Sequence, residues 1–238
     1  MAGRKSDFTL TKLDDLFTTQ AQREEEKLSK IRDIPLGLID DFPDHPFKVR
    51  DDEDMLQLIE SIRDRGVITP ATVRQKEDGR YELISGHRRK RACELAGFQT
   101  LRCEVVDLSR DEATILMVES NFQRSKILPS EKAFAYKMKN EAMKRKGGRK
   151  GSQIAPHLKG KKTVEIIGEE SGDSPKQVQR YIKITELIPE LLQQLDDEMI
   201  GFNPAVEIAS LKKEEQKQLL DAMDYAQSTP SLSQAQRI

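Results

Sequence analysis

The pattern of apolar and polar positions divides the chain into two parts. Between residues 31 and 118, short strand-like runs alternate with amphipathic helices, whereas no strand-like run follows Glu119. This order predicts a small α+β lobe followed by an all-α domain. We expect a flexible tail over residues 1–30, the α+β lobe over 31–126, the helical domain over 127–230 and the start of a linker over 231–238.

Two strands joined by a tight turn form the centre of the predicted lobe. Residues 67–74 are strand-like apart from Pro70, which lacks an N–H group and therefore marks a sheet edge or a strand start. An Asp-Gly pair at 78–79 predicts a hairpin turn into a second strand over residues 81–84. Alternating apolar side chains predict another strand over residues 101–105.

Helices with one apolar face accompany these strands. One is predicted over residues 55–62, with Asp51 or Asp52 as its N-cap and Gly66 at its end. Another follows the second strand and ends at Gly97. The lobe therefore combines short strands with amphipathic helices that can cover a sheet.

Capping signals mark the helices of the second part. Ser109 and Glu112 form a capping box for one helix, and Ser130 follows a proline break as the expected N-cap of a helix over residues 131–146. Later amphipathic helices are expected to support the domain, and Asn203 caps one of them. The helix over 131–146 is expected to pack through Phe134, Met138 and Ala142.

Composition favours two small lobes over one large globule. The chain of 238 residues is 36% hydrophobic and 34% charged and has no Trp, so any single core is modest. Cys93 and Cys103 fall in apolar patterns without metal-ligand spacing, which is typical of reduced core cysteines in a cytoplasmic protein. No apolar run approaches the roughly 18 residues of a membrane span, so no membrane partner is expected.

A basic turn lies where the second strand passes into its helix, with the sequence Ser85-Gly86-His87-Arg88-Arg89-Lys90-Arg91. A glycine at such a turn lets backbone N–H groups approach an anion, and the helix N-terminus adds about half a positive charge. Arginine side chains can bind phosphate oxygens with two parallel hydrogen bonds. We interpret the turn as a phosphate-binding site, with a solvated basic helix start as the competing interpretation.

Lysine and arginine are concentrated between residues 144 and 162. This stretch holds eight of them and no acidic residue, although the formal net charge of the whole chain is −1. Affinity for nucleic acid must therefore come from local asymmetry of this kind. We expect a phosphate-binding arm that ends at Lys161 and Lys162, and a solvated basic linker is the alternative.

Residues 163–184 carry a helix-turn-helix pattern. Gly168 is a small residue where the helices cross, and Gly172 permits a left-handed turn. Asp173 departs from the pattern because that turn position is usually apolar, so an ordinary helical hairpin remains possible. The outward side chains of the second helix are of kinds that bind base edges and phosphates in a major groove; they are Ser174, Lys176, Gln177, Gln179, Arg180 and Lys183.

The order of these motifs resembles the ParB/RepB family of centromere-binding partition proteins, found on plasmids and integrative elements. The resemblance covers roughly residues 31–235. Besides the helix-turn-helix, it rests on Gly66-Val67-Ile68-Thr69-Pro70, Gly86-His87-Arg88-Arg89-Lys90-Arg91-Ala92 and Asn121-Phe122-Gln123-Arg124.

The resemblance implies a specific function. Members bind a short palindromic centromere in double-stranded DNA through the helix-turn-helix, and they bind CTP with Mg²⁺ in the N-terminal lobe. They close as homodimeric clamps that slide on DNA, and they act with a ParA-type ATPase on the nucleoid in the cytoplasm. They usually end in a separate dimerisation segment, toward which residues 231–238 would begin a linker.

The resemblance also implies roles for individual residues. Asn121 would place Mg²⁺ through the nucleotide. Ser120 stands where the family has a glutamate tied to hydrolysis, and Glu119 is one residue early, a rotation of about 100° on a helix. These two are the catalytic candidates, and weak CTPase activity is expected only if hydrolysis is retained. The implied nucleotide-binding residues are Thr69, Gly86, His87, Arg88, Arg89, Ser120, Asn121 and Arg124, with His87 in place of the family's glutamate.

Two other functions stay open at this point. One is a plain helix-turn-helix transcriptional regulator whose N-terminal lobe only dimerises. The other is an enzyme on a scaffold similar to that of sulfiredoxin, whose chemistry needs a nucleophilic cysteine just before the histidine. Gly86 occupies that position here, and both cysteines lie elsewhere, which disfavours the enzyme.

Overall fold

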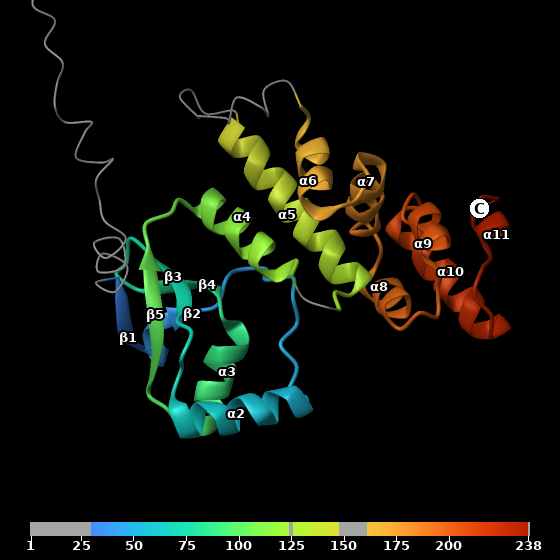
Figure 1. Cartoon of the computed structure of the whole chain (residues 1–238). Helices are drawn as coiled ribbons and strands as arrows, with labels where there is room; N and C mark the ends of the chain where they lie inside the picture. The colour runs from blue at the N-terminus through green and yellow to red at the C-terminus, as the bar shows by residue number, and fades with distance from the viewer. Residues whose placement is uncertain (1–29, 124–125, 148–160, 238) are drawn as a thin grey trace, which may run out of the picture. The chain divides into compact units, whose positions relative to one another are not determined.

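The chain divides by its internal packing into two compact units (Figure 1). The first comprises Met1–Asp40 and Asp52–Asp107, and the second comprises Asp41–Asp51 and Leu108–Ile238. The first unit holds every strand of the sheet, and the second is helical in the parts described, which confirms the predicted fold class. The structure is a computed structural model and describes residues 30–123, 126–147 and 161–237.

A five-stranded mixed sheet organises the first unit, with strand order β1-β5-β3-β4-β2. β1 pairs antiparallel with β5, β5 runs parallel to β3, β3 pairs antiparallel with β4, and β4 runs parallel to β2. Its elements are β1 (Ile31–Pro35), η3 (Leu36–Leu38), β2 (Ile39–Asp40), α2 (Glu53–Arg65), β3 (Ala71–Gln75), β4 (Tyr81–Ser85), α3 (His87–Ala96) and β5 (Thr100–Val106).

The boundaries of α2 follow from its caps. Asp52 is the N-cap, and its carboxylate accepts a hydrogen bond from the Met55 N–H group at 3.0 Å. Acidic residues in the first turn and basic residues in the last complement the helix dipole. Gly66 ends the helix with φ = 70°, a backbone conformation that favours glycine. Of the two N-caps expected for this helix, Asp52 is the correct one.

The strand predicted over residues 67–74 begins four residues later than expected. β3 starts at Ala71 and lies between β5 and β4, so it is an interior strand of the sheet. Pro70 has no N–H group for the ladder and stands immediately before the strand, which confirms a strand start and excludes an edge. Residues 66–70 form a loop that leads into β3.

Both cysteines lie in the core of the first unit. Cys93 and Cys103 are fully buried among the apolar side chains of the sheet, α2 and α3, and both are free thiols. Burial raises the pKa of Cys103 to about 12 and also raises that of Cys93. Protonated, buried thiols are poor nucleophiles, so neither is a candidate for cysteine chemistry.

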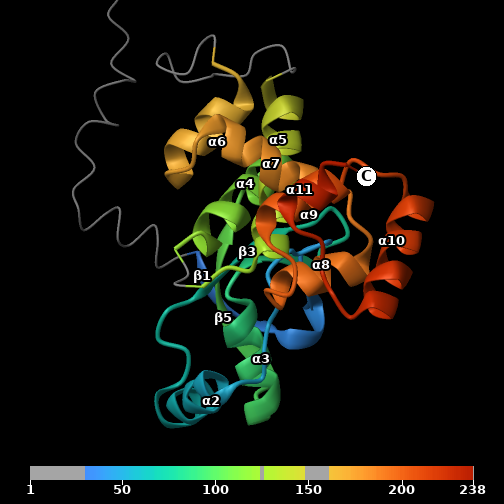
Figure 2. The same ribbon diagram turned by 90° about the vertical axis from the view of Figure 1, so that its right-hand side faces the viewer.

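A long helix organises the second unit. α5 packs against α4, α6, α7 and α8, while α8, α9, α10 and α11 group together toward the C-terminal end of the unit (Figure 2). The helices are α4 (Arg110–Asn121), α5 (Pro129–Gly147), α6 (Thr163–Ser171), α7 (Pro175–Ile184), α8 (Pro189–Asp196), α9 (Phe202–Ile208), α10 (Lys213–Ala226) and α11 (Leu232–Ala235).

The buried face of α5 differs from the predicted one. Ala142 is buried as predicted and Met138 is half-buried, but Phe134 is 37% exposed, and Tyr136 and Lys139 are buried instead. Because α5 is surrounded by four helices, its buried positions do not follow a single apolar stripe. Ser130 is also not an N-cap: it lies inside α5, and its hydroxyl donates to the Asp196 carboxylate at 2.5 Å.

Three boundaries depart from the expected organisation. α4, which we assigned to the N-terminal lobe, groups with the helical unit, so the division falls after Asp107. The residues predicted to begin a linker include α11, whose Ala235 is buried against the core of this unit. α9 is capped by Gly201, so Asn203 lies inside its first turn. In the described part of the chain, the helices are all too short or too polar to traverse a bilayer.

Candidate functional site

Gly86 makes the turn between β4 and α3. Its φ of 105° is a left-handed conformation, and a Cβ atom on this residue would lie only 2.8 Å from the Ala71 Cβ atom. Glycine is therefore required both by the backbone and by the packing. The helix starts at once with His87, so the N–H groups of its first turn lie at the turn, as in phosphate-binding sites.

Arg89 braces this turn from the side of α3. Its guanidinium donates to the Thr69 carbonyl oxygen at 2.6 Å and also to that of Pro70. Burial lowers the pKa of Arg89, but arginine stays charged in proteins. The loop over residues 66–70 is thereby held against the turn, which brings Thr69, Gly86 and Arg89 together; that they bind a nucleotide stays a prediction.

Arg88 has a different partner, which the sequence did not reveal. Its Nη2 atom lies 2.9 Å from Asp52 Oδ1 and its Nη1 atom 3.4 Å from Oδ2. Desolvation raises the pKa of Asp52, but hydrogen bonds from Arg88 and from the Met55 N–H group outweigh it, so that pKa lies below its ordinary value. The N-cap of α2 therefore doubles as the carboxylate that binds Arg88.

The other predicted nucleotide-binding residues belong to the second unit. Ser120 and Asn121 lie in the last turn of α4, where the Ser120 hydroxyl and the Asn121 amide both donate to the Met117 carbonyl oxygen, at 2.9 and 2.8 Å. Arg124 lies outside the described residues. That these residues join Gly86 in one nucleotide site stays a prediction.

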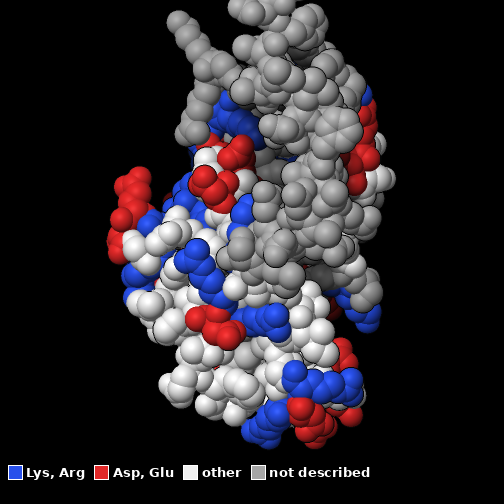
Figure 3. Space-filling model, turned by 60° about the vertical axis from the view of Figure 1, so that its left-hand side comes forward, with Lys and Arg blue, Asp and Glu red and all other residues white. Residues whose placement is uncertain are grey.

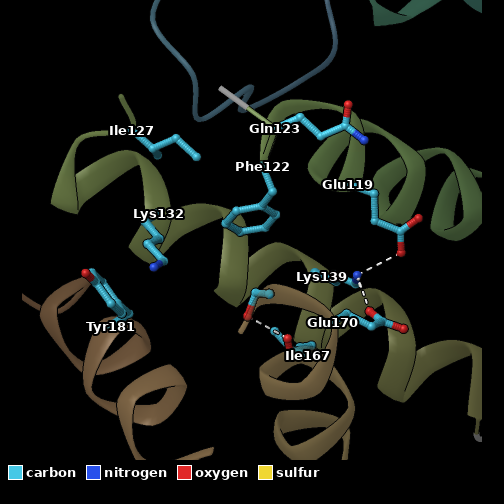
Figure 4. Close-up of a pocket in the computed structure, with 10 residues that line it drawn as sticks. Glu119, Phe122, Gln123, Ile127, Lys132, Lys139, Ile167, Glu170 and Tyr181 are labelled. Atoms are coloured by element: carbon cyan, nitrogen blue, oxygen red, sulfur yellow. Dashed lines mark hydrogen bonds and ion pairs between the residues drawn. The ribbon is translucent and has the colours of Figure 1, made fainter. Parts of the chain in front are cut away.

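Glu119, one of the two catalytic candidates, is bound to a buried lysine (Figure 4). The Lys139 ammonium lies 2.7 Å from a Glu119 oxygen and 2.6 Å from a Glu170 oxygen, and its side chain is only 3% exposed. These residues line a hollow of about 740 Å³ together with Phe122 and Tyr181. Both lysines that line this hollow are paired with carboxylates, Lys139 with Glu119 and Glu170, and Lys132 with Asp173 at 2.7 Å.

The predicted helix pair is present as α6 and α7. A Cβ atom on Gly168 would lie 2.5 Å from the Asp173 carbonyl oxygen, so only glycine allows the turn to approach α6 this closely. Gly172 has φ = 76°, and Ser174 caps α7 by accepting the Gln177 N–H group at 3.1 Å. The glycines and the cap that we predicted from the sequence are confirmed.

The atypical Asp173 is explained by two partners from α5. The Tyr136 hydroxyl donates to its carboxylate at 2.6 Å, and Lys132 Nζ lies 2.7 Å away. Desolvation raises the pKa of Asp173, but these two contacts outweigh it and hold the pKa below its usual value. The charge at a position that is usually apolar is thus fully compensated.

The predicted DNA-binding side chains differ in their exposure to solvent. Lys176, Gln179 and Lys183 are exposed. Arg180 is partly buried: its guanidinium donates to Asn203 and lies 5.2 Å from the centre of the Phe202 ring. Arg180 is therefore braced against α9, a contact that favours a fixed rather than a mobile guanidinium.

The end of the predicted basic arm is partly neutralised. Lys161 binds the Glu169 carboxylate at 2.6 Å, and the Lys162 N–H group donates to Glu165 at the start of α6. On the face drawn in Figure 3, basic and acidic side chains are interspersed. Residues 148–160 of the arm lie outside the described part. Across the described ranges, no group of three or more His, Cys, Asp or Glu residues could hold a metal ion.

Comparison with known proteins gives consistent matches. Residues 19–122 match the ParB N-terminal domain. The chromosome-partitioning protein Spo0J of Thermus thermophilus is 31% identical over 182 residues, which are 76% of this chain and 61% of that relative. The probable plasmid-partitioning protein ParB of the same organism is 26% identical, over 85% of this chain and 74% of its own. The chain thus spans less than two thirds of the length of Spo0J.

A solved structure is also similar. The C-terminally truncated chromosome-partitioning protein ParB from Caulobacter crescentus, in complex with the centromeric parS site, is 23% identical with a TM-score of 0.49, covering 87% of this chain and 97% of that one. Gly86 and Asn121 both lie within the matched residues 19–122. The chain is thus similar to partition proteins of the ParB kind, and its residues 19–122 match their N-terminal domain.

Proposed function

We propose that this chain is a centromere-binding partition protein that binds a specific site in double-stranded DNA and is controlled by CTP. One observation carries the proposal: a ParB N-terminal domain and a helix pair closed by Gly168 occur in the same chain. The names of the two similar proteins from Thermus thermophilus give this partition role. It would place the protein on the nucleoid in the cytoplasm.

DNA recognition is assigned to α7. Its exposed Lys176, Gln179 and Lys183 are residue types that bind phosphates and base edges, and Ser174 and Gln177 at its N-terminus are of the same kind. Two copies of the chain would read the two halves of a palindrome, since the symmetry of a dimer matches that of its site. A ParA-type ATPase is the partner that this role requires.

The Gly86 turn suits the phosphates of a nucleotide. At position 86 the packing leaves no room for a Cβ atom, so the residue must be glycine. The turn also presents the first-turn N–H groups of α3 and the guanidinium of Arg88. The base is cytosine by resemblance to the family. Mg²⁺ would be held by the nucleotide's own phosphates, with Asn121 as the proposed protein contact, and when bound it would neutralise phosphate charge.

Binding of CTP is better supported than its hydrolysis. Ser120 occupies the position where the family has a glutamate, and the neighbouring Glu119 is engaged with Lys139. The Glu119 carboxylate lies 2.7 Å from the Lys139 ammonium and would have to leave this ion pair to act on a water molecule. We propose that CTP acts mainly as a ligand that controls DNA binding, with a low rate of hydrolysis at most.

Selection from a random duplex library tests the DNA role. We expect enrichment of one inverted repeat, bound with an affinity that falls with salt by a log–log slope of about −0.9 per phosphate contacted. Gln179→Ala should weaken binding to the selected site by about 1–3 kcal/mol and leave random DNA unaffected, if Gln179 contacts a base.

Alanine substitutions of two lysines serve as comparisons for Gln179→Ala. Lys183→Ala should weaken binding to selected and random DNA alike, because a phosphate contact carries no sequence information. Lys217→Ala removes the same charge from an exposed position on α10 and should change neither. A library that yields no enriched sequence would contradict the proposal.

A further inference from the structure

Asp52 has two roles in the first unit. As the N-cap of α2 it accepts the Met55 N–H group at 3.0 Å, and across to α3 it binds Arg88 at 2.9 Å. Both contacts use the same oxygen, Oδ1, and the other oxygen lies 3.4 Å from the second terminal nitrogen of Arg88. The carboxylate therefore faces the guanidinium with both oxygens, which is the geometry that a phosphate would adopt.

We propose that Asp52 is a built-in competitor for the nucleotide: it holds Arg88 until the phosphates of CTP displace it. The inference rests on the proposed function, because it concerns the same site. It assigns Asp52 a regulatory role in setting how tightly the Gly86 turn binds a triphosphate. Asp52 acts through Arg88 and does not itself contact the ligand.

The contrast between the two arginines supports this role. Arg89 donates to two backbone carbonyl oxygens, and its release would leave the loop over residues 66–70 without its brace. Arg88 is one-third exposed and its partner Asp52 is 41% exposed, so water can replace either group. Arg88 is thus the arginine that can exchange a carboxylate for a phosphate without uncovering buried polar groups.

The helix cap need not be broken by the exchange. Asp52 keeps the Met55 N–H group when Arg88 leaves, so α2 retains its N-cap. Removing the charge of Asp52 releases Arg88 for the phosphates, so this change should strengthen nucleotide binding.

Asp52→Asn isolates the charge from the cap. Asparagine is as good an N-cap as aspartate, so the thermal unfolding midpoint should stay close to that of the parent chain. Asp78→Asn is the matched control, since it removes one negative charge from the tip of the β3–β4 hairpin, at the opposite end of β4 from Gly86. There the amide oxygen can still accept the Arg80 N–H group, as the Asp78 carboxylate does at 2.9 Å.

The test is titration of the full chain with Mg²⁺ and CTP, CDP or CMP. We expect Asp52→Asn to tighten CTP binding about two- to fivefold, as for a surface ion pair, with a smaller gain for CDP and the smallest for CMP. A purely structural effect of the substitution would change all three alike. In an Arg88→Gln background the gain should vanish, and Asp78→Asn should leave all three affinities unchanged.

Other results separate this inference from the proposed function. If the parent chain binds CTP but Asp52→Asn binds it equally or more weakly, Asp52 is not a competitor. If Asp52→Asn still tightens CTP binding in the Arg88→Gln background, Asp52 weakens binding through its charge alone and the inference is wrong. If neither the parent chain nor any variant binds CTP, the proposed nucleotide site is wrong and the inference falls with it.

Discussion

Replacing Glu119 and Glu170 together by alanine is expected to lower the free energy of unfolding by about 3–5 kcal/mol. The two carboxylates are the ion-pair partners of Lys139, whose side chain is 3% exposed on the central helix of the second unit. Without them the ammonium would be buried and uncompensated. Either single replacement leaves one partner in place, so the two effects should be strongly non-additive.

A third substitution provides the internal control. Adding Lys139→Met to the double variant removes the buried charge itself and should recover most of the lost stability. Glu186→Ala is the matched surface case, because Glu186 pairs with Lys137 at 3.6 Å in an exposed position and should change stability by no more than about 1 kcal/mol. Equal denaturation midpoints for the double variant and the parent chain would refute this assignment.

Gly168→Ala is expected to disturb the α6–α7 helix pair, to which we assign DNA binding. The added Cβ atom would meet the Asp173 carbonyl oxygen at 2.5 Å, and because that atom belongs to the backbone, the turn must move. We expect a loss of about 1–3 kcal/mol in stability, as for overpacking in a core. The same displacement of α7 should weaken binding to the selected DNA site by about 1–3 kcal/mol for each base that α7 can no longer reach.

Gly37→Ala serves as the comparison for this variant. No atom lies within 4 Å of a Cβ at Gly37, so its effect on stability should remain within about 0.5 kcal/mol. Thermal unfolding and DNA titration of both variants check the prediction. If Gly168→Ala bound the selected site with unchanged affinity, the tight approach of the turn to α6 would not matter for DNA recognition.

Features set by local chemistry were predictable from the sequence. The capping box of Ser109 and Glu112, the cap at Ser174 and the left-handed Gly172 each depend on residues within a few positions. The turn at position 86 was predicted from its glycine, which lets backbone N–H groups approach an anion, whereas its left-handed φ of 105° is a finding of the structure.

Features set by distant partners were not predictable. The pairing of Arg88 with Asp52 spans 36 residues, and Asp52 already had a sufficient explanation as a helix cap. On α5, the sequence pattern favoured Phe134 over Lys139, because a charged residue is rarely buried unless it is paired. Only the convergence of α4 and α6 on α5 supplies the two carboxylates that make burial of Lys139 possible.

Binding of the CTP phosphates at the Gly86 turn is the basis of the proposed control of DNA binding. Calorimetric titration of the full chain with Mg²⁺ and each of CTP, ATP, GTP and UTP tests it most directly. We expect saturable binding of CTP, much weaker binding of the other three, and weakened but measurable CTP binding by Arg88→Gln. Absence of heat with CTP, or equal binding of CTP and ATP, would contradict it.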